Sequence, residues 1–224
     1  MAGRIAAVVF DMDGLMLDTE LLYKAAWQEA AAELGYALDD ATYCRFIGRT
    51  TDDAERELAR HFGPTFPGDR FHERWPAAWR RHAEGGIPTK PGLPELLAYL
   101  DATGIPFAVA TSSDADYAAF SLERAGLAAR IGVIVTADDV ALGKPAPDLY
   151  LEAARRLAVP PSTCVALEDS DAGVISAHHA TMLTLMIPDL KPPSDEAAAL
   201  AFRVLGSLHE APAILADLIA NPAR

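Results

Sequence analysis

Cysteine is scarce in this chain of 224 residues, which contains only Cys44 and Cys164. Two cysteines cannot form the disulfide framework that stabilises small secreted domains, and they fit no Cys/His zinc pattern. The six histidines show no metal-ligand spacing. We therefore expect a protein of a reducing compartment, with no zinc site.

Positively charged residues are also few: the chain has 19 Lys and Arg residues against 32 Asp and Glu residues, so its formal net charge is −13. Such a balance opposes nonspecific binding to nucleic acid, so we expect no nucleic-acid partner. It also opposes anionic substrates at long range. Any phosphate site in this chain must therefore build its own local positive field.

Long hydrophobic runs are missing, since no apolar stretch reaches the roughly 18 residues that a membrane span needs. The apolar segment Met1 to Phe10 runs directly into acidic residues and has no small-residue cleavage site, unlike a secretory signal. Hydrophobic residues make up 51% of the chain, which is enough to bury a core. We expect a soluble cytoplasmic protein with no membrane partner, and a monomer.

The most informative segment present is Asp11-Met12-Asp13-Gly14, which follows the apolar run Ile5 to Phe10. Two carboxylates at the end of a buried strand repel each other and lose hydration. A divalent cation would offset that cost. Residues i and i+2 of a strand lie on the same side, so both groups can face one ion or substrate. The alternative is an ordinary Asp-Gly turn.

The segment after this motif has the pattern of helices only. Apolar residues recur at helical spacing in four stretches, and we find no convincing strand between Leu21 and Ala83. The expected helices are Leu21 to Gly35, Asp39 to Phe46, Thr51 to Phe62 and Gly68 to Ala83. A break dense in Gly and Pro follows at Gly85 to Gly92 and indicates a linker.

Beyond the linker, helical stretches alternate with short apolar runs, a pattern typical of a parallel sheet covered by helices. The expected strands are Ile105 to Ala110, Ile131 to Val135, Thr163 to Leu167 and Met182 to Ile187. The expected helices are Pro94 to Thr103, Asp116 to Ala125, Asp148 to Leu157 and Ala172 to Ala180. The first strand has no α/β partner until residue 105, so the helical block is an insertion. We expect an α/β core of residues 1–17 and 88–224, and an inserted helical cap of residues 18–87.

Polar residues follow four of the expected strands, where parallel α/β sheets place their sites. After the first strand come Asp11 and Asp13, and after the others come Thr111-Ser112-Ser113, Gly143-Lys144-Pro145-Ala146-Pro147-Asp148 and Glu168-Asp169-Ser170. Each of these motifs alone has a plain structural alternative as a helix cap or a solvated loop charge. Their convergence indicates a chemical site.

Together these residues suit phosphoryl transfer. Asp11 can attack phosphorus as a carboxylate nucleophile, and Asp13 can protonate the leaving oxygen and then activate water. Asp169 and Asp11 can hold Mg²⁺ through oxygen atoms, and Lys144 can neutralise the phosphate. Thr111, its neighbour Ser112 and nearby N–H groups can bind the phosphate oxygens.

In this order the four motifs resemble those of the haloacid dehalogenase superfamily, and Asp11 to Glu20 is similar to the opening of its β-phosphoglucomutase-like branch. The resemblance covers essentially the whole chain. It implies a Rossmann-like core with a helical cap inserted after the first motif. It also implies that the Asp13 backbone carbonyl completes the metal shell and that Glu168 contributes through water or directly. The second aspartate of the first motif, here Asp13, separates phosphotransferases from dehalogenases.

Two departures distinguish this chain from the mutases of that branch. The mutases usually carry Gly-x-Ser-Arg in a cap loop where this chain has Gly48-Arg49-Thr50-Thr51, and a histidine where Tyr23 falls. A mutase must exclude water from its phosphoenzyme, whereas a phosphatase need not. The departures therefore favour a phosphatase, with Arg49 as a candidate substrate-binding residue or, alternatively, a cation at a helix end.

We therefore predict an enzyme: a Mg²⁺-dependent phosphatase that hydrolyses small phosphomonoesters, sugar phosphates above all, through an aspartyl-phosphate. The alternatives are a β-phosphoglucomutase-type mutase and a catalytically silent binding module. The expected partner is a small phosphorylated metabolite. We expect the segment Ile187 to Pro193 to be a surface loop without a chemical role.

Overall fold

The structure, a computed structural model, describes residues 5–46 and 51–221. Contacts within the chain divide it into two compact units. One unit consists of Met1–Asp18 with Pro88–Arg224, and the other is Thr19–Ile87. Among the described residues, no helix is long and apolar enough to cross a membrane.

The larger unit is built on a six-stranded sheet with the order β3-β2-β1-β4-β5-β6. Its neighbouring strands are all parallel, which confirms the α/β class and the Rossmann-like core. The strands are β1 (Ala7–Phe10), β2 (Phe107–Ala110), β3 (Ile134–Val135), β4 (Cys164–Glu168), β5 (Leu183–Met186) and β6 (Arg203–Val204).

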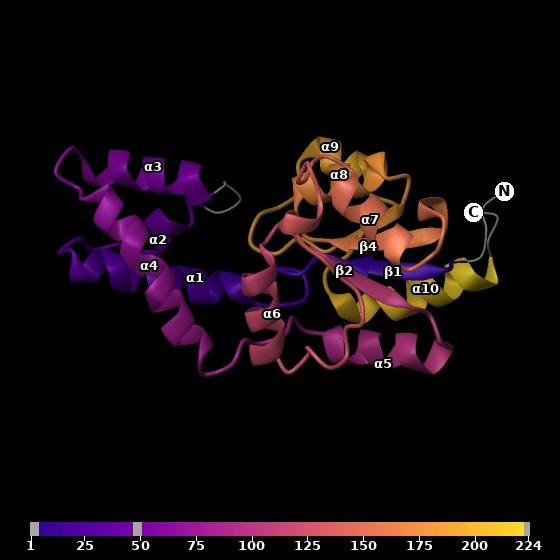
Figure 1. The fold of residues 1–224 in the computed structure, drawn as a ribbon. Coiled ribbons are helices and arrows are strands. Elements are labelled where there is room, and N and C mark those ends of the chain that lie inside the picture. Colours follow the sequence, from indigo (N-terminus) through magenta and orange to yellow (C-terminus); the bar gives the residue numbers. More distant parts are fainter. Residues whose placement is uncertain (1–4, 47–50, 222–224) are drawn as a thin grey trace. The chain divides into compact units, whose positions relative to one another are not determined.

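Helices cover both faces of this sheet, as parallel strands require. In Figure 1, α7 and α8 lie on one face, and α5 and α10 lie on the other. The helices are α5 (Leu93–Thr103), α6 (Ala115–Arg124), α7 (Asp148–Arg156), α8 (Asp171–His179), α9 (Asp195–Leu200) and α10 (Ala211–Ala220). Short 3-10 turns occupy Ala137–Asp139, Pro161–Thr163 and Leu208–Glu210.

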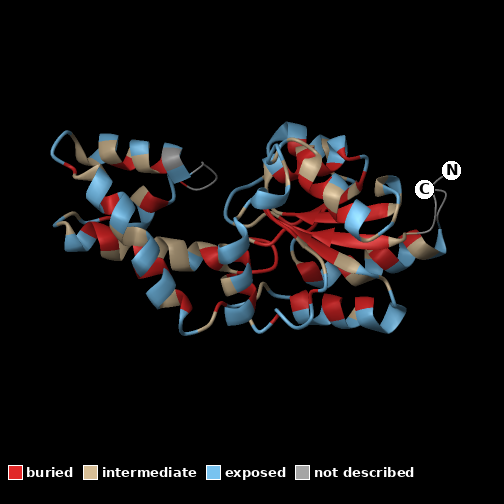
Figure 2. Ribbon diagram, viewed as in Figure 1, coloured by how far each residue is buried: buried red, intermediate tan, exposed pale blue. Residues whose placement is uncertain are grey.

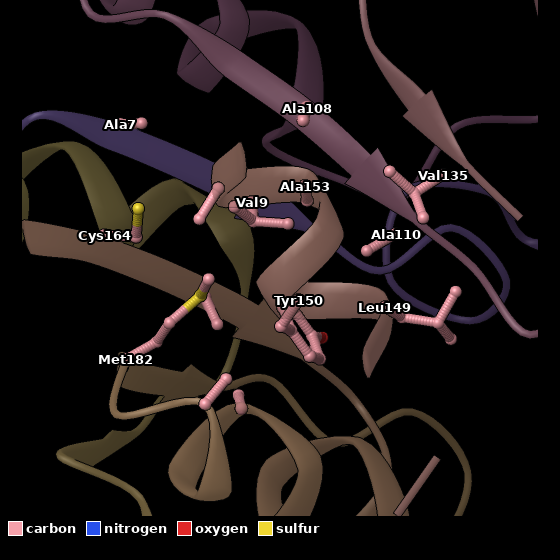
Figure 3. Packing of buried hydrophobic residues seen from close by; sticks show 14 residues of the cluster. Ala7, Val9, Ala108, Ala110, Val135, Leu149, Tyr150, Ala153, Cys164 and Met182 are labelled. Atoms are coloured by element: carbon pink, nitrogen blue, oxygen red, sulfur yellow. The ribbon is translucent and has the colours of Figure 1, made fainter. Parts of the chain in front are cut away.

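The central strands lie inside the core and are buried, as their red colour in Figure 2 shows. On the side of α7 and α8 the sheet presents small residues, among them Ala7, Ala108 and Ala166. Tyr150 and Leu149 of α7 pack there (Figure 3). Small sheet residues leave room for these large side chains at the density of a protein interior.

The smaller unit consists of helices around an aromatic core, as the periodicity predicts. Its elements are α1 (Thr19–Glu33), α2 (Asp40–Tyr43), α3 (Thr51–Phe62) and α4 (Gly68–Ala83). Trp27 of α1 stands edge-on to Tyr43 and Phe71, with ring centroids 6.0 and 5.1 Å away. Tyr23 lies 5.8 Å from Trp75 and 5.7 Å from Trp79, so its ring belongs to this packing.

Several elements differ from the sequence-based expectation. The helix expected over Asp39 to Phe46 ends at Tyr43, because the chain turns there, and the strand expected over Ile131 to Val135 pairs with β2 only at Ile134 and Val135. The sequence patterns did not predict α9, β6 or α10. Strand β6 is two exposed residues long, which is too short to show a period of two.

Candidate active site

The order of the strands reverses at β1, which lies between β2 and β4. Ligands of open α/β sheets bind at such a switch point, outside the carboxyl ends of the strands. Asp11 comes directly after β1, and its N–H donates to the Leu167 carbonyl of β4 at 2.9 Å. Thr111 comes directly after β2, and its N–H donates to Val135 at 2.9 Å. The backbone hydrogen bonds of the sheet thus continue one residue past each strand, and they hold Asp11 and Thr111 in place.

Lys144 brings two of the predicted acidic residues together. Its Nζ donates to Asp11 Oδ1, to Glu168 Oε1 at 2.6 Å and to the Ala110 carbonyl at 3.1 Å. Burial alone would lower the pKa of Lys144, but the Asp11 and Glu168 carboxylates raise it above its usual value. The ammonium group therefore stays charged inside the site.

The carboxylates at the switch point hold more negative charge than Lys144 can neutralise. Burial raises the pKa of Asp11, and Glu168 adds to that effect while Lys144 opposes it. Burial likewise raises the pKa of Asp169 well above its ordinary value, with Asp11 and Glu168 as further causes. Both groups would ionise more readily beside an additional positive charge.

The geometry of the site fits a divalent cation. Asp11, Glu168 and Asp169 each offer a carboxylate oxygen, and these three atoms lie within 4.8 Å of one another. The set contains only oxygen, which suits a hard cation and not a soft one. The residues present therefore suit such an ion.

Glu168 is fully buried, and protein donors reach both of its oxygens. Oε1 accepts from Lys144 and from the Tyr150 hydroxyl at 2.6 Å, and Oε2 accepts from Ser170 Oγ at 3.0 Å. A Cβ at Gly173 of α8 would overlap this carboxylate. Glu168 therefore anchors Lys144 as well as standing in the acidic cluster.

Asp13 has different partners from the acidic cluster. Its Oδ2 accepts from Ser113 Oγ and its Oδ1 from the Tyr117 hydroxyl, both at 3.0 Å. The next residue, Gly14, has φ of +81°, and a Cβ there would collide with Asp169 Oδ2. The chain can therefore turn beside Asp169 only with glycine at this position.

The predicted phosphate-binding residues lie at the end of β2. Thr111 is buried, and its Oγ1 accepts from the Ser113 N–H at 3.1 Å. Ser112 is exposed beside it. Arg49, the predicted substrate-binding residue of the cap, lies outside the described residues.

Sequence reasoning missed three groups that lie in or beside this site. Tyr117 lies in the first turn of α6, and Tyr150 lies in the first turn of α7, six positions after Lys144. Both tyrosines lie at the start of a helix that directly follows a polar motif, and this position was the signal that could have identified them. The third group is Asp189: the segment Ile187 to Pro193 follows β5 as a loop with residues 190–192 exposed, as expected, but the Asp189 side chain is only 10% exposed and pairs with Lys90 at 2.5 Å.

Comparison with known proteins places the chain in a family. The sequence profile of the haloacid dehalogenase-like hydrolases matches residues 8–187. A Drosophila melanogaster protein named "Probable pseudouridine-5'-phosphatase" is 33% identical over 231 residues, which cover 92% of this chain and 91% of that protein.

Solved structures agree with this fold. CbbY from Rhodobacter sphaeroides, in complex with phosphate, has a TM-score of 0.74 and 32% identity, and the match covers 92% of this chain and 96% of CbbY. A β-phosphoglucomutase from Clostridium difficile has a TM-score of 0.72 and 21% identity, covering 96% and 99% of the two chains. That second likeness shows the fold alone.

The matched residues 8–187 contain all four motifs at the switch point, from Asp11 to Asp169. The fold, the order of the motifs and the named relative therefore agree. The chain belongs to the haloacid dehalogenase-like hydrolase family, in which it is a phosphoric monoester hydrolase.

Proposed function

We propose that this chain is a Mg²⁺-dependent phosphatase that hydrolyses small phosphomonoesters, sugar phosphates above all, through a phosphorylated Asp11. One observation carries the proposal: Asp11 shares Lys144 with Glu168 and lies beside Asp169, while Asp13 has partners of its own. A nucleophile, a cation that neutralises phosphate and a separate acid–base group are the parts that this chemistry needs.

In the first half-reaction, a carboxylate oxygen of Asp11 attacks phosphorus and the bond from phosphorus to the ester oxygen breaks. Asp13 gives its proton to that leaving oxygen, so the alcohol departs neutral. Lys144 neutralises part of the charge on the phosphoryl oxygens, and Thr111 and Ser112 donate hydrogen bonds to them. The products are the free alcohol and the aspartyl-phosphate.

In the second half-reaction, water attacks the phosphorus of the aspartyl-phosphate. Asp13, now ionised, takes a proton from that water, and Asp11 leaves as a carboxylate with release of inorganic phosphate. Hydrogen bonds from Ser113 and Tyr117 orient the Asp13 carboxylate for this step. Both enzyme groups return to their starting state.

The residues that would hold the metal are Asp11, Glu168 and Asp169, together with the Asp13 backbone carbonyl. Mg²⁺ bound there supplies a positive charge that polarises the phosphoryl group. The set of oxygen donors supports Mg²⁺ over zinc.

The remaining predictions from sequence belong to the same proposal. Residues 18–87 would form the cap that selects the substrate, with Arg49 as a contact to it. The partner would be a small phosphorylated metabolite, and the phosphate bound to CbbY supports a site of that chemistry. We also propose that the enzyme acts in the cytoplasm as a monomer.

The test is a screen of small phosphomonoesters for release of inorganic phosphate, with Mg²⁺ and with a chelator. We expect release from several esters with Mg²⁺, none with the chelator and none from Asp11→Asn. Asp195→Asn removes an exposed carboxylate of α9 and serves as the matched control, with wild-type rates expected. Full activity without metal, or in Asp11→Asn, would contradict the mechanism.

The mutase alternative is tested with β-glucose 1-phosphate, by following both inorganic phosphate and glucose 6-phosphate. A phosphatase releases phosphate without a bisphosphate activator. Rapid formation of glucose 6-phosphate, stimulated by the bisphosphate and with little phosphate released, would overturn the proposal in favour of a mutase. Absence of any reaction across the screen would support a silent binding module.

A further inference from the structure

Asp189 is a buried carboxylate whose two oxygens differ in their hydrogen bonding. It lies in the segment after β5, and its side chain is 10% exposed. Oδ1 accepts a hydrogen bond from Lys90 Nζ at 2.5 Å, and Lys90 also lies 3.6 Å from Asp18. Oδ2 is buried and has no hydrogen-bond partner among the described residues. Leaving such an oxygen without a donor costs free energy, so the position calls for an explanation.

The unpartnered oxygen faces the acidic cluster. A Cβ built on Gly14 would meet Asp169 Oδ2 and would lie 3.5 Å from Asp189 Oδ2. The two carboxylate oxygens therefore flank the same point beside the turn that follows β1. Asp189 is also among the charges that raise the pKa of Asp169, after burial, Asp11 and Glu168.

The ion pair with Lys90 provides a hydrogen-bond donor for Oδ1 but none for Oδ2. With a cation bound, Asp169 is held in its ionised form, and an ionised carboxylate only accepts, so it supplies no donor to Oδ2. A water molecule bound to a metal is a donor, and carboxylates outside the ligand shell commonly receive such hydrogen bonds. The position of Oδ2 beside a candidate ligand fits that role.

We propose that Asp189 is a positioning residue that accepts a hydrogen bond from a water molecule of the Mg²⁺ shell, and that Lys90 fixes its orientation. The inference rests on the metal site of the proposed function. It adds a residue, from a segment outside the four motifs, that helps to decide how tightly the ion is held.

The test measures Mg²⁺ affinity by isothermal titration calorimetry without substrate. Loss of an outer carboxylate typically weakens metal affinity by about 10- to 100-fold, and we expect that loss in Asp189→Asn. Lys90→Met removes the ion pair but keeps the acceptor oxygen, so its affinity should fall much less. Asp195→Asn removes an exposed carboxylate of α9 that is not part of the acidic cluster, and it should bind Mg²⁺ as the wild type does.

A double variant covers the case in which Asp189→Asn folds poorly because Lys90 loses its partner. Lys90→Met/Asp189→Asn removes both charges together and should show the same loss as Asp189→Asn, with folding checked by circular dichroism. Wild-type affinity in the folded Asp189 variants, or an equal loss in Lys90→Met, would overturn this inference alone. A wild-type protein that binds no Mg²⁺ would overturn the metal site and this inference with it.

Discussion

Glu168 lies in the fully buried interior, and specific donors stabilise its carboxyl group there. Lys144 and Tyr150 reach one oxygen, and Ser170 reaches the other. A buried charge is tolerated only with such partners, and removing one member leaves the others without theirs. The same residue that holds Lys144 therefore also supports the fold.

Replacing Glu168 with glutamine tests that dual role. The amide keeps the shape but loses the charge, so we expect the free energy of unfolding to fall by about 1.5–3 kcal/mol, the range for a hydrogen bond to a charged group. Urea unfolding in metal-free buffer measures it. Glu152→Gln on the exposed side of α7 is the control and should change stability far less, because its ion pairs are at the surface. Equal losses in the two variants would refute the assignment.

Tyr117 offers a test of the environment of Asp13. Tyr117→Phe removes the hydroxyl that donates to Asp13 Oδ1, a hydrogen bond worth about 0.5–1.5 kcal/mol. We expect kcat for phosphate release to fall by roughly 2- to 12-fold, with little change in stability. Tyr99→Phe in α5 serves as the matched control and should keep the wild-type rate. A wild-type kcat in Tyr117→Phe would show that this hydroxyl does not orient Asp13.

The elements that the sequence predicted each have a recognisable pattern within their own residues. Strands β1, β2 and β4 are apolar runs that end in polar motifs, and these motifs meet because parallel strands end at one edge. Helix α9 has six residues and β6 has two, which is too short for a period to show. Asp189 was missed for another reason, because only the tertiary fold brings its loop beside Gly14.

The contact between α8 and β4 leads to a prediction at Gly173. Alanine favours a helix by about 1 kcal/mol over glycine, so Gly173→Ala would normally stabilise α8. Here the added Cβ would overlap the Glu168 carboxylate, and we expect a lower free energy of unfolding and a lower rate of phosphate release.

The control for Gly173 is another helical glycine. Gly68 begins α4, and a Cβ there would meet nothing within 4 Å among the described residues. Gly68→Ala should therefore be neutral or mildly stabilising in urea unfolding. If Gly173→Ala behaves in the same way, the α8 backbone can move away from Glu168 and the close approach is not required.

Across the whole molecule, each unit carries one thiol, and the two differ in access. Cys44 of the helical unit is exposed, whereas Cys164 of β4 is buried and burial raises its pKa to about 11. We expect a thiol reagent at neutral pH to modify one cysteine per native chain, and both after unfolding in urea. Mass spectrometry of the labelled peptides identifies the site. Rapid labelling of Cys164 in the native protein would contradict the burial of β4.

The chain leaves the sheet-bearing unit and returns to it at neighbouring points. Leu17 forms an isolated antiparallel bridge with Thr89, and the Asp18 N–H donates to the Pro88 carbonyl at 2.8 Å. Residues 19–87 are therefore an insertion between two adjacent points of the backbone, and a short turn could join Asp18 to Pro88 in their place. Under the proposed role of residues 18–87 in selecting the substrate, exchange of this insert between related proteins would change the preferred phosphomonoester and leave the reacting groups of the core in place. A protein with residues 19–87 replaced by a Gly-Ser turn should still unfold cooperatively in urea, and failure to do so would show that the core depends on the insert.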